Sequence, residues 1–272
     1  MLSAPLVQAP RNASPIVIER VPDLEHLRRR DRRSIPKVIV QDHPLANDPM
    51  VDLRELGFED ASSFYSRPNR LTGAVLPGVA DTPFARLDLG RRLTRADKFL
   101  RTDDEVRKTL GAPARIKIED AYRPPDVQLF AYDIAWPAVI RAKHPELSDE
   151  DVARERDRYV TRPADGSPVS PHSTGGAVDV RLINLDTNEP FNRGHDGGNV
   201  TKTAYPDRYE DSDSHDYPSE IVAARRVLYF AMVEVAGLQV NPFEIWHYGI
   251  GEPKSEFYAG RSTPYYGLAT LT

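Results

Sequence analysis

Two segments far apart in the chain constrain the fold more than any other feature of the sequence. Residues 170–179 read Ser-Pro-His-Ser-Thr-Gly-Gly-Ala-Val-Asp, and residues 243–249 read Phe-Glu-Ile-Trp-His-Tyr-Gly. Together they supply two histidines, one aspartate and one glutamate, enough to hold a divalent metal with two imidazoles and a carboxylate and to leave a second carboxylate beside it. A fold that uses these residues jointly has to bring the two segments together.

The spacing of His172 and Asp179 requires a bend between them. In a straight strand, residues seven positions apart lie ~23 Å apart on opposite faces, and in a helix they lie ~10 Å apart along the axis. Neither geometry lets both bind one ion, because ligand atoms lie about 2 Å from zinc. The bend is expected at Gly175 and Gly176, since glycine accepts backbone angles that other residues resist.

Glu244 precedes His247 by three residues, and the sequence leaves the local backbone open. On a helix this spacing places both residues on one face. The aromatic and β-branched neighbours favour a strand, where an odd spacing places them on opposite faces unless a bulge or twist intervenes. Taken singly, His247 is also compatible with a core histidine, Asp179 with a turn cap and Glu244 with an ion-pair partner.

Composition narrows the class of protein. A length of 272 residues allows one large domain or two small ones, and 40% hydrophobic with 28% charged residues is typical of a packed soluble protein. The net charge of -5 argues against a nucleic-acid partner. The absence of cysteine excludes a thiolate metal site, so any zinc must be bound by histidine and carboxylate.

No apolar run approaches the ~20 residues needed to span a bilayer, so we expect no membrane partner. The N-terminus lacks a charged region followed by a long apolar stretch and makes a poor signal peptide. We therefore expect a cytoplasmic protein, with a periplasmic or secreted location left open. The sequence does not indicate an oligomeric state.

Local patterns predict an α+β fold with a central, mostly antiparallel sheet and helices packed against it. Residues 1–49 contain seven prolines and are expected to form an extended arm, followed by one domain over residues 50–272. The expected strands cover residues 51–56, 116–119, 177–183 and 243–250, and the expected helices cover residues 87–100, 103–110, 125–143 with a kink at Pro137, 149–159 and 221–235. Residues 186–217 are expected to form a long polar loop.

The chain resembles the D-alanyl-D-alanine dipeptidase family, the VanX-like zinc peptidases, in three motifs. Their Ser-x-His-x-x-Gly-x-Ala-x-Asp motif matches residues 170–179, and their Glu-x-Trp-His-Tyr matches residues 244–248. Their Asp-x-Tyr-Arg-Pro matches residues 120–124, and the three motifs occur in the family's order. The resemblance covers roughly residues 50–260 and implies a zinc site in a cleft on the sheet.

The resemblance implies one Zn²⁺ per chain bound by His172, Asp179 and His247, with Glu244 as general base and Arg123 as stabiliser of the transition state. The chemistry of these residue types agrees with that assignment. Three protein ligands leave a fourth position for water, and zinc lowers the pKa of that water toward ~7. A carboxylate then accepts its proton, and an arginine donates to the developing oxyanion.

Further residues are expected around the substrate. Ser170, Tyr122 and Trp246 lie within the matching motifs and are predicted to contact it. Within the long loop, residues 195–199 are candidates to close over the substrate, with a surface loop as the alternative.

The expected function is hydrolysis of D-alanyl-D-alanine or a related D-amino-acid dipeptide. One alternative is a D,D-carboxypeptidase or endopeptidase acting on peptidoglycan stem peptides. A second is an iron(II) enzyme with the same two-histidine, one-carboxylate ligands. A third is a non-catalytic zinc-binding domain. The presence of Glu244 disfavours the iron enzyme, and Glu244 together with Arg123 disfavours the non-catalytic domain.

Overall fold

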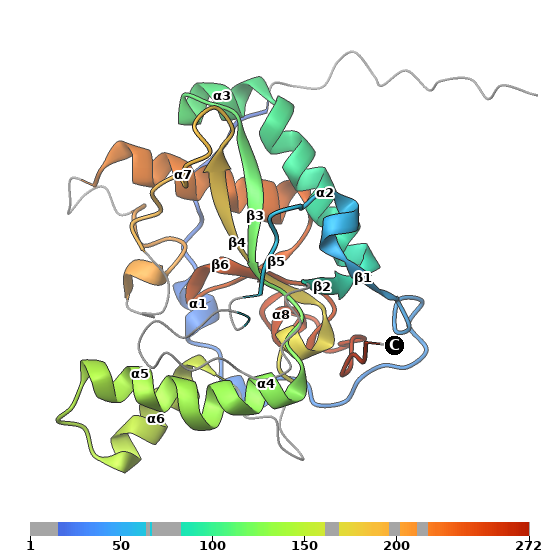
Figure 1. Ribbon diagram of the computed structural model, residues 1–272, viewed down its shortest axis with the longest axis vertical. Coiled ribbons are helices and arrows are strands. Elements are labelled where there is room, and N and C mark those ends of the chain that lie inside the picture. Colours follow the sequence, from blue (N-terminus) through green and yellow to red (C-terminus); the bar gives the residue numbers. More distant parts are fainter. Residues whose placement is uncertain are drawn as a thin grey trace, which may run out of the picture.

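The centre of the protein is a four-stranded antiparallel sheet with strand order β3-β4-β6-β5 (Figure 1). The computed structural model describes residues 16–63, 66, 83–160, 169–195, 202–210 and 217–271. The strands of the central sheet are β3 (Ala114–Asp120), β4 (Ala177–Asn184), β5 (Gln239–Asn241) and β6 (Glu244–Gly249). The predicted α+β class with a mostly antiparallel sheet is confirmed. Strand β5 was not predicted, because three residues are too few to show an alternating pattern.

Helices α2 (Leu87–Thr102) and α7 (Ser219–Tyr229) pack against the sheet and bury its apolar face. Leu89, Leu93 and Leu100 of α2 are fully buried, as their helical spacing predicts. Helix α7 continues into a π-helical turn, Phe230–Val235, so the predicted stripe over residues 221–235 is confirmed.

The short helix α3 (Asp104–Leu110) also forms where the sequence predicts it. The Asp103 side chain accepts a hydrogen bond from the backbone N–H of Glu105, which caps the helix start. Gly111 ends the helix in the left-handed region, with φ of 76°.

The strand predicted over residues 51–56 is only partly correct. Strand β1 (Met50–Asp52) pairs with β2 (Phe84–Arg86), and a 3-10 turn replaces the rest of the predicted strand. The Asp52 carboxylate accepts the backbone N–H of Arg54 at 2.9 Å, which favours the turn over further pairing.

The long helix predicted over residues 125–143 is divided earlier than expected. It consists of α4 (Pro125–Phe130), a π-helical turn (Ala131–Ala135) and α5 (Trp136–Lys143). Pro137 lies in the first turn of α5, and because it has no N–H to donate, the irregularity falls on the turn before it rather than at the proline.

Helix α6 (Asp149–Tyr159) packs against α5, and α4, α5 and α6 form a helical hairpin at one end of the molecule (Figure 1). The Ser148 side chain accepts a hydrogen bond from the backbone of Asp151 at the start of α6. The predicted helix over residues 149–159 is confirmed.

Residues 16–49 run along the body and include helix α1 (Glu25–Arg28). Leu24 is buried in the main core, and Arg28 forms an ion pair of 2.8 Å with Asp207. Residues 1–15 of the predicted arm lie outside the described residues, and the boundary at residue 49 stays a prediction.

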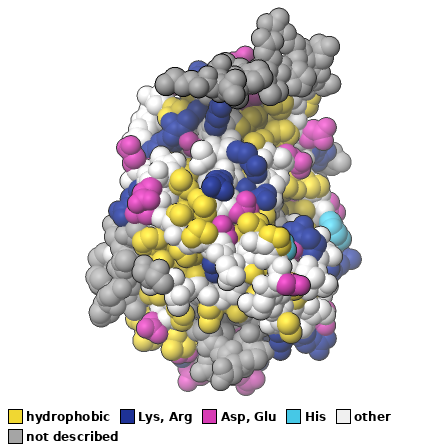
Figure 2. Space-filling view, turned by 90° about the vertical axis from the view of Figure 1, so that its right-hand side faces the viewer, with side chains coloured by type: hydrophobic (Ala, Val, Ile, Leu, Met, Phe, Trp, Pro, Cys, Tyr) yellow, Lys and Arg dark blue, Asp and Glu magenta, His cyan; other side chains and the backbone are white. Residues whose placement is uncertain are grey.

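Helix α8 (Pro253–Tyr258), which was not predicted, packs against β5 and β6. The surface over α2, β1 and the C-terminal segment carries charged side chains of both signs interspersed with apolar ones (Figure 2). No helix within the described ranges has the length and apolar character needed to cross a bilayer.

Candidate metal centre

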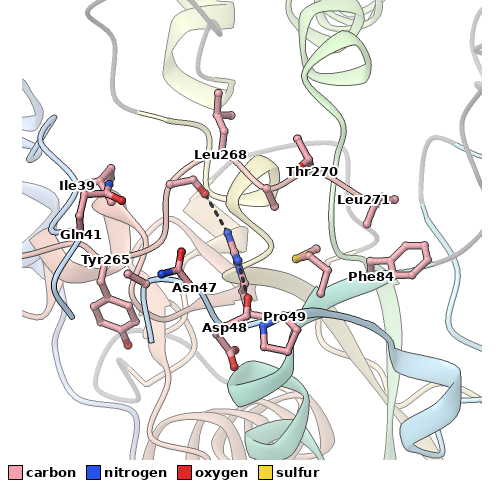
Figure 3. Close-up of a pocket in the computed structure, with 15 residues that line it drawn as sticks. Ile39, Gln41, Asn47, Asp48, Pro49, Phe84, Tyr265, Leu268, Thr270 and Leu271 are labelled. Carbon is pink, nitrogen blue, oxygen red and sulfur yellow. Dashed lines mark hydrogen bonds between the residues drawn. The ribbon is translucent and has the colours of Figure 1, made fainter. Parts of the chain in front are cut away.

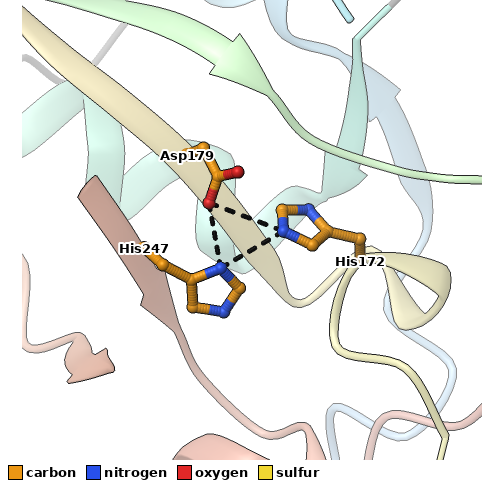
Figure 4. A group of neighbouring side chains, drawn as sticks. All are labelled: His172, Asp179 and His247. Atoms are coloured by element: carbon orange, nitrogen blue, oxygen red, sulfur yellow. Dashed lines mark hydrogen bonds and ion pairs between the residues drawn. The ribbon is translucent and has the colours of Figure 1, made fainter. Parts of the chain in front are cut away.

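Three potential metal ligands converge at the sheet (Figure 4). His172 begins a 3-10 turn, His172–Thr174, just before β4, while Asp179 lies on β4 and His247 on β6. Asp179 and His247 are directly opposite each other in the antiparallel pairing of the two strands. The structure therefore brings together the three residues that the two sequence segments supply.

The separations among the three ligand atoms fit a tetrahedral ion. His172 Nε2 lies 3.2 Å from His247 Nδ1, His247 Nδ1 lies 2.9 Å from Asp179 Oδ1, and Asp179 Oδ1 lies 3.5 Å from His172 Nε2. Atoms about 2.0–2.1 Å from a tetrahedral zinc are about 3.3 Å from one another. Two imidazole nitrogens and one carboxylate oxygen at this spacing can hold zinc and leave its fourth position open.

Hydrogen bonding selects the nitrogen that His172 presents. His172 Nδ1 lies 2.8 Å from the carbonyl oxygen of Ala121, and because a carbonyl only accepts, this nitrogen carries the proton. His172 Nε2 is then the unprotonated atom facing the group. His247 presents Nδ1, and its buried Nε2 has no hydrogen-bond partner in the described part of the chain.

Electrostatics favours a charged carboxylate at Asp179. Burial alone would raise the pKa of Asp179, but His172 and His247 outweigh burial and hold that pKa well below its usual range. Burial alone would lower the pKa of His172, but the Asp179 carboxylate outweighs it and raises that pKa above the ordinary value. The ionised carboxylate is the form that binds a metal cation.

The predicted bend lies at Gly175, whose φ is 71°. A Cβ on Gly175 would lie 2.5 Å from the Sδ atom of Met50, and one on Gly176 would lie 2.7 Å from the carbonyl oxygen of Ile250. The left-handed backbone conformation favours glycine at 175, and the close backbone carbonyl leaves no room for a side chain at 176. The bend expected between His172 and Asp179 is confirmed.

Glu244 and His247 lie at an irregularity in the pairing of β5 with β6. Val240 is opposite Tyr248, but Asn241 is opposite Glu244, so residues 245–247 have no partner on β5. The segment is a strand, as its neighbours favour, with an irregularity in the place where the odd spacing required one.

Glu244 is not one of the three gathered ligands, but it lies in the same charged neighbourhood. Asn241 Nδ2 donates a hydrogen bond to its carboxylate. Burial outweighs the nearby carboxylates of Glu244, Glu252 and Asp179 and holds the pKa of Lys254 below its ordinary value. One ammonium group thus lies within electrostatic reach of both Glu244 and the ligand Asp179.

Arg123 is joined through its backbone to the 3-10 turn that begins at His172. Its N–H donates to the carbonyl of His172 at 3.1 Å, and its own carbonyl accepts from the Ser173 hydroxyl at 2.8 Å. The guanidinium donates to Asp120 at 2.5 Å and to Gln128 at 2.7 Å. Asp120 and Gln128 were not identified from the sequence as site residues, although Asp120 is the first residue of the matching Asp-x-Tyr-Arg-Pro segment.

The three predicted substrate contacts have structural partners. The buried Tyr122 hydroxyl donates to the carbonyl of Ala269 at 2.8 Å, and the backbone carbonyl of Ser170 accepts from Ser173 at 3.0 Å. Trp246 belongs to the main core and stacks on His195, with ring centroids 4.9 Å apart. Their roles toward substrate stay predictions, and residues 196–199 of the candidate loop lie outside the described residues.

Comparison with known proteins identifies one related dipeptidase. The chain is 28% identical over 163 residues to a D-alanyl-D-alanine dipeptidase of Synechocystis sp.. The match covers 55% of this chain and 66% of that relative. No protein-family model matches the chain. The similarity makes this chain a distant relative of that dipeptidase.

Proposed function

We propose that this protein is a zinc-dependent peptidase that hydrolyses D-alanyl-D-alanine or a related D-amino-acid dipeptide. The observation that carries the proposal is the convergence of His172, Asp179 and His247 at the spacing of a tetrahedral zinc site. The distant relationship to a dipeptidase supports hydrolysis of the peptidase type in general. The dipeptide substrate and the zinc are the more specific parts of the proposal.

In the proposed mechanism, His172, Asp179 and His247 hold Zn²⁺, which when bound lowers the pKa of a water molecule toward about 7. The Glu244 carboxylate accepts a proton from the attacking water and later donates it to the departing amine. Asn241 holds this carboxylate through its side-chain amide.

Arg123 is proposed to stabilise the negative charge that develops on the scissile carbonyl oxygen. Its bonds to Asp120 and Gln128 fix the plane of the guanidinium, and its backbone is bonded to the metal-binding turn. An arginine preorganised in this way stabilises an oxyanion at little cost in reorganisation at the moment of reaction. Asp120 and Gln128 act in this scheme by orienting Arg123.

A dipeptide panel with metal quantification tests the proposal. D,D-, L,L- and D,L-dipeptides and a pentapeptide ending in two D-alanines are incubated with protein purified without added metal. We expect stoichiometric zinc, preferential cleavage of the D,D-dipeptide, loss of activity with a chelator and recovery with zinc. Cleavage of the pentapeptide alone would indicate a carboxypeptidase instead. Stoichiometric iron without peptidase activity would contradict the proposal.

A further inference from the structure

Four successive carbonyl groups of the metal-binding turn, residues 172–175, accept hydrogen bonds from residues outside it. The donors are the backbone N–H of Arg123 to His172 (3.1 Å), the backbone N–H of Ala269 to Ser173 (2.9 Å), Arg86 Nε to Thr174 (2.9 Å) and the backbone N–H of Arg86 to Gly175 (2.9 Å). Arg86 therefore supplies two of the four bonds. It also supplies the one bond that comes from a side chain.

The rest of the Arg86 guanidinium joins this turn to two other stretches of chain. Nη1 donates to the carbonyl of Asp48 at 2.6 Å, and Nη2 approaches the carbonyl of Gly267 at 3.5 Å. The guanidinium carbon lies 5.0 Å from the centre of the Tyr266 ring. In the described part of the chain, no carboxylate lies within ion-pair distance of Arg86, so its donors serve backbone carbonyls. One buried cation thus links the segment before β1, the metal-binding turn and the C-terminal segment.

We propose that Arg86 is a positioning residue for the metal centre, which holds the turn so that His172 points at Asp179 and His247. The inference rests on the metal binding in the proposed function. The His172 ring is oriented by its bond to Ala121, but the position of the ring depends on the backbone of the turn. A charged donor gives a stronger hydrogen bond than a neutral one, so Arg86 makes the strongest single contact to that backbone.

Arg86 also borders a pocket of about 560 Å³ (Figure 3). The pocket lies between residues 39–50 and residues 265–271, next to Phe84, and none of the three ligand residues lines it. A shorter side chain at position 86 leaves space continuous with this pocket rather than a sealed void. We therefore expect variants at this position to fold.

Arg225 provides a matched control. It is 1% exposed, and its guanidinium also donates to three backbone carbonyls, those of Arg193, Tyr205 and Thr203. None of these three residues is a metal ligand. The variants Arg86→Met and Arg225→Met thus remove the same chemical group from two sets of carbonyls. Only the set bonded by Arg86 includes a carbonyl of the metal-binding turn, that of Thr174.

The test is a zinc titration against a chromophoric chelator, with thermal unfolding recorded in parallel. Changes to groups that orient metal ligands typically weaken metal binding ~10–100-fold. We expect a loss of this size in Arg86→Met, a smaller loss in Arg86→Lys, and wild-type zinc affinity in Arg225→Met despite a lower melting temperature.

Wild-type zinc affinity in Arg86→Met, or an equal loss in Arg225→Met, overturns the inference. If Arg86→Met does not fold even in excess zinc, the zinc affinity of Arg86→Lys is the test. Wild-type zinc affinity in Arg86→Lys would also contradict the inferred role of Arg86. A wild-type chain that binds no zinc removes the proposed function itself and this inference with it. Failure of the proposed function is therefore distinguishable from failure of the role of Arg86.

Discussion

The two sides of the candidate site are built differently. On the side of the candidate metal ligands, every carbonyl from His172 to Gly176 accepts a hydrogen bond, the last from the backbone of Ile250 at 2.9 Å. On the side of Glu244, residues 245–247 have no partner on β5, and Asn241 holds the carboxylate through its side chain. Hydrogen bonds to successive backbone carbonyls, one of them from the Arg86 side chain, thus place the ligand side, whereas a side-chain contact across an irregular strand pairing places Glu244.

This difference matches the separate roles of the metal ligands and of Glu244 in the proposed mechanism. Metal ligands have to stay within ~0.2 Å of fixed distances. A general base has to reach a water molecule and later a leaving amine, two positions that need not coincide. The comparison leads to five predictions, from the largest expected effect to the smallest.

Asp179→Ala should abolish zinc binding. Asp179 is one of three ligands, and its loss should weaken binding by more than the ~100-fold seen when groups that merely orient ligands are changed. Zinc titration and peptidase assay measure the effect. Asp186→Ala, an exposed residue beyond the end of β4, should behave as wild type. Retention of stoichiometric zinc in Asp179→Ala would contradict the ligand assignment.

Glu244→Ala should keep zinc and lose turnover by ~10²–10⁴, the usual contribution of a general acid-base group. The reason is that Glu244 lies outside the group of three ligands. Metal content and steady-state kinetics are measured together, with the exposed Glu220→Ala as control. Unchanged activity in Glu244→Ala would remove it from the proposed mechanism.

Gly175→Ala should destabilise the fold by ~1–3 kcal/mol, the cost of a strained backbone, and also weaken zinc binding. A Cβ there meets both a φ of 71° and the Met50 sulfur at 2.5 Å. Gly111→Ala is the matched control, because its φ is 76° but no atom lies within 4 Å of an added Cβ. Denaturant unfolding should show the larger loss for Gly175→Ala. Equal losses would mean that packing against Met50 contributes nothing.

Asn241→Ala should reduce turnover roughly tenfold while zinc affinity stays unchanged. It removes the amide that donates to Glu244, and a hydrogen bond to a charged group is worth about 1.5 kcal/mol. Kinetics and zinc titration on the same preparation measure the two sides of the site separately. A loss of zinc affinity in this variant would show that the two sides are coupled.

The pH dependence of stability should differ between the metal-free and zinc-loaded protein. The raised pKa of His172 stabilises the metal-free fold below the unfolded value of about 6.5, and this stability is lost as the pH rises through the folded pKa. The lowered pKa of Asp179 contributes stability above about 3.9, lost as the pH falls below that value. These two contributions should make metal-free protein most stable between about pH 4 and 6.5.

Zinc-loaded protein should instead gain stability as the pH rises past the upper limit of this window, because zinc binding requires neutral His172. We therefore expect zinc affinity to fall as the pH drops toward 6, and the stabilisation by zinc to grow as the pH rises. Thermal unfolding over a pH series with and without zinc measures both. Parallel pH profiles would contradict the metal assignment of His172.

Long periodic segments were predictable, and short or irregular ones were not. The stripe of Leu89, Leu93 and Leu100 predicts α2, because an apolar face must be buried whatever it packs against. Strand β5 and helix α8 have three and six residues, too few for a period to appear. The π-helical turn before Pro137 depends on how the backbone rearranges where the proline N–H is missing. No local sequence pattern specifies that rearrangement.

Within the site, the grouping of the three candidate ligands could be predicted, but the residues that support them could not. His172, Asp179 and His247 lie in segments whose residue types are those that zinc prefers. Arg86 and Gln128 carry no such signal, since arginine and glutamine are common throughout soluble proteins. The bond from Arg86 to Thr174 also joins residues far apart in the sequence, which no local pattern indicates.

The amino-acid sequence alone specifies the candidate ligand residues and a bend at Gly175 and Gly176, because ligand chemistry and backbone freedom are properties of single residues. The three-dimensional fold sets the register that places Asp179 opposite His247, the nitrogen that each histidine presents and the bonds that hold the turn. These features depend on hydrogen bonds between distant segments, and such bonds form only when the sheet has brought those segments together.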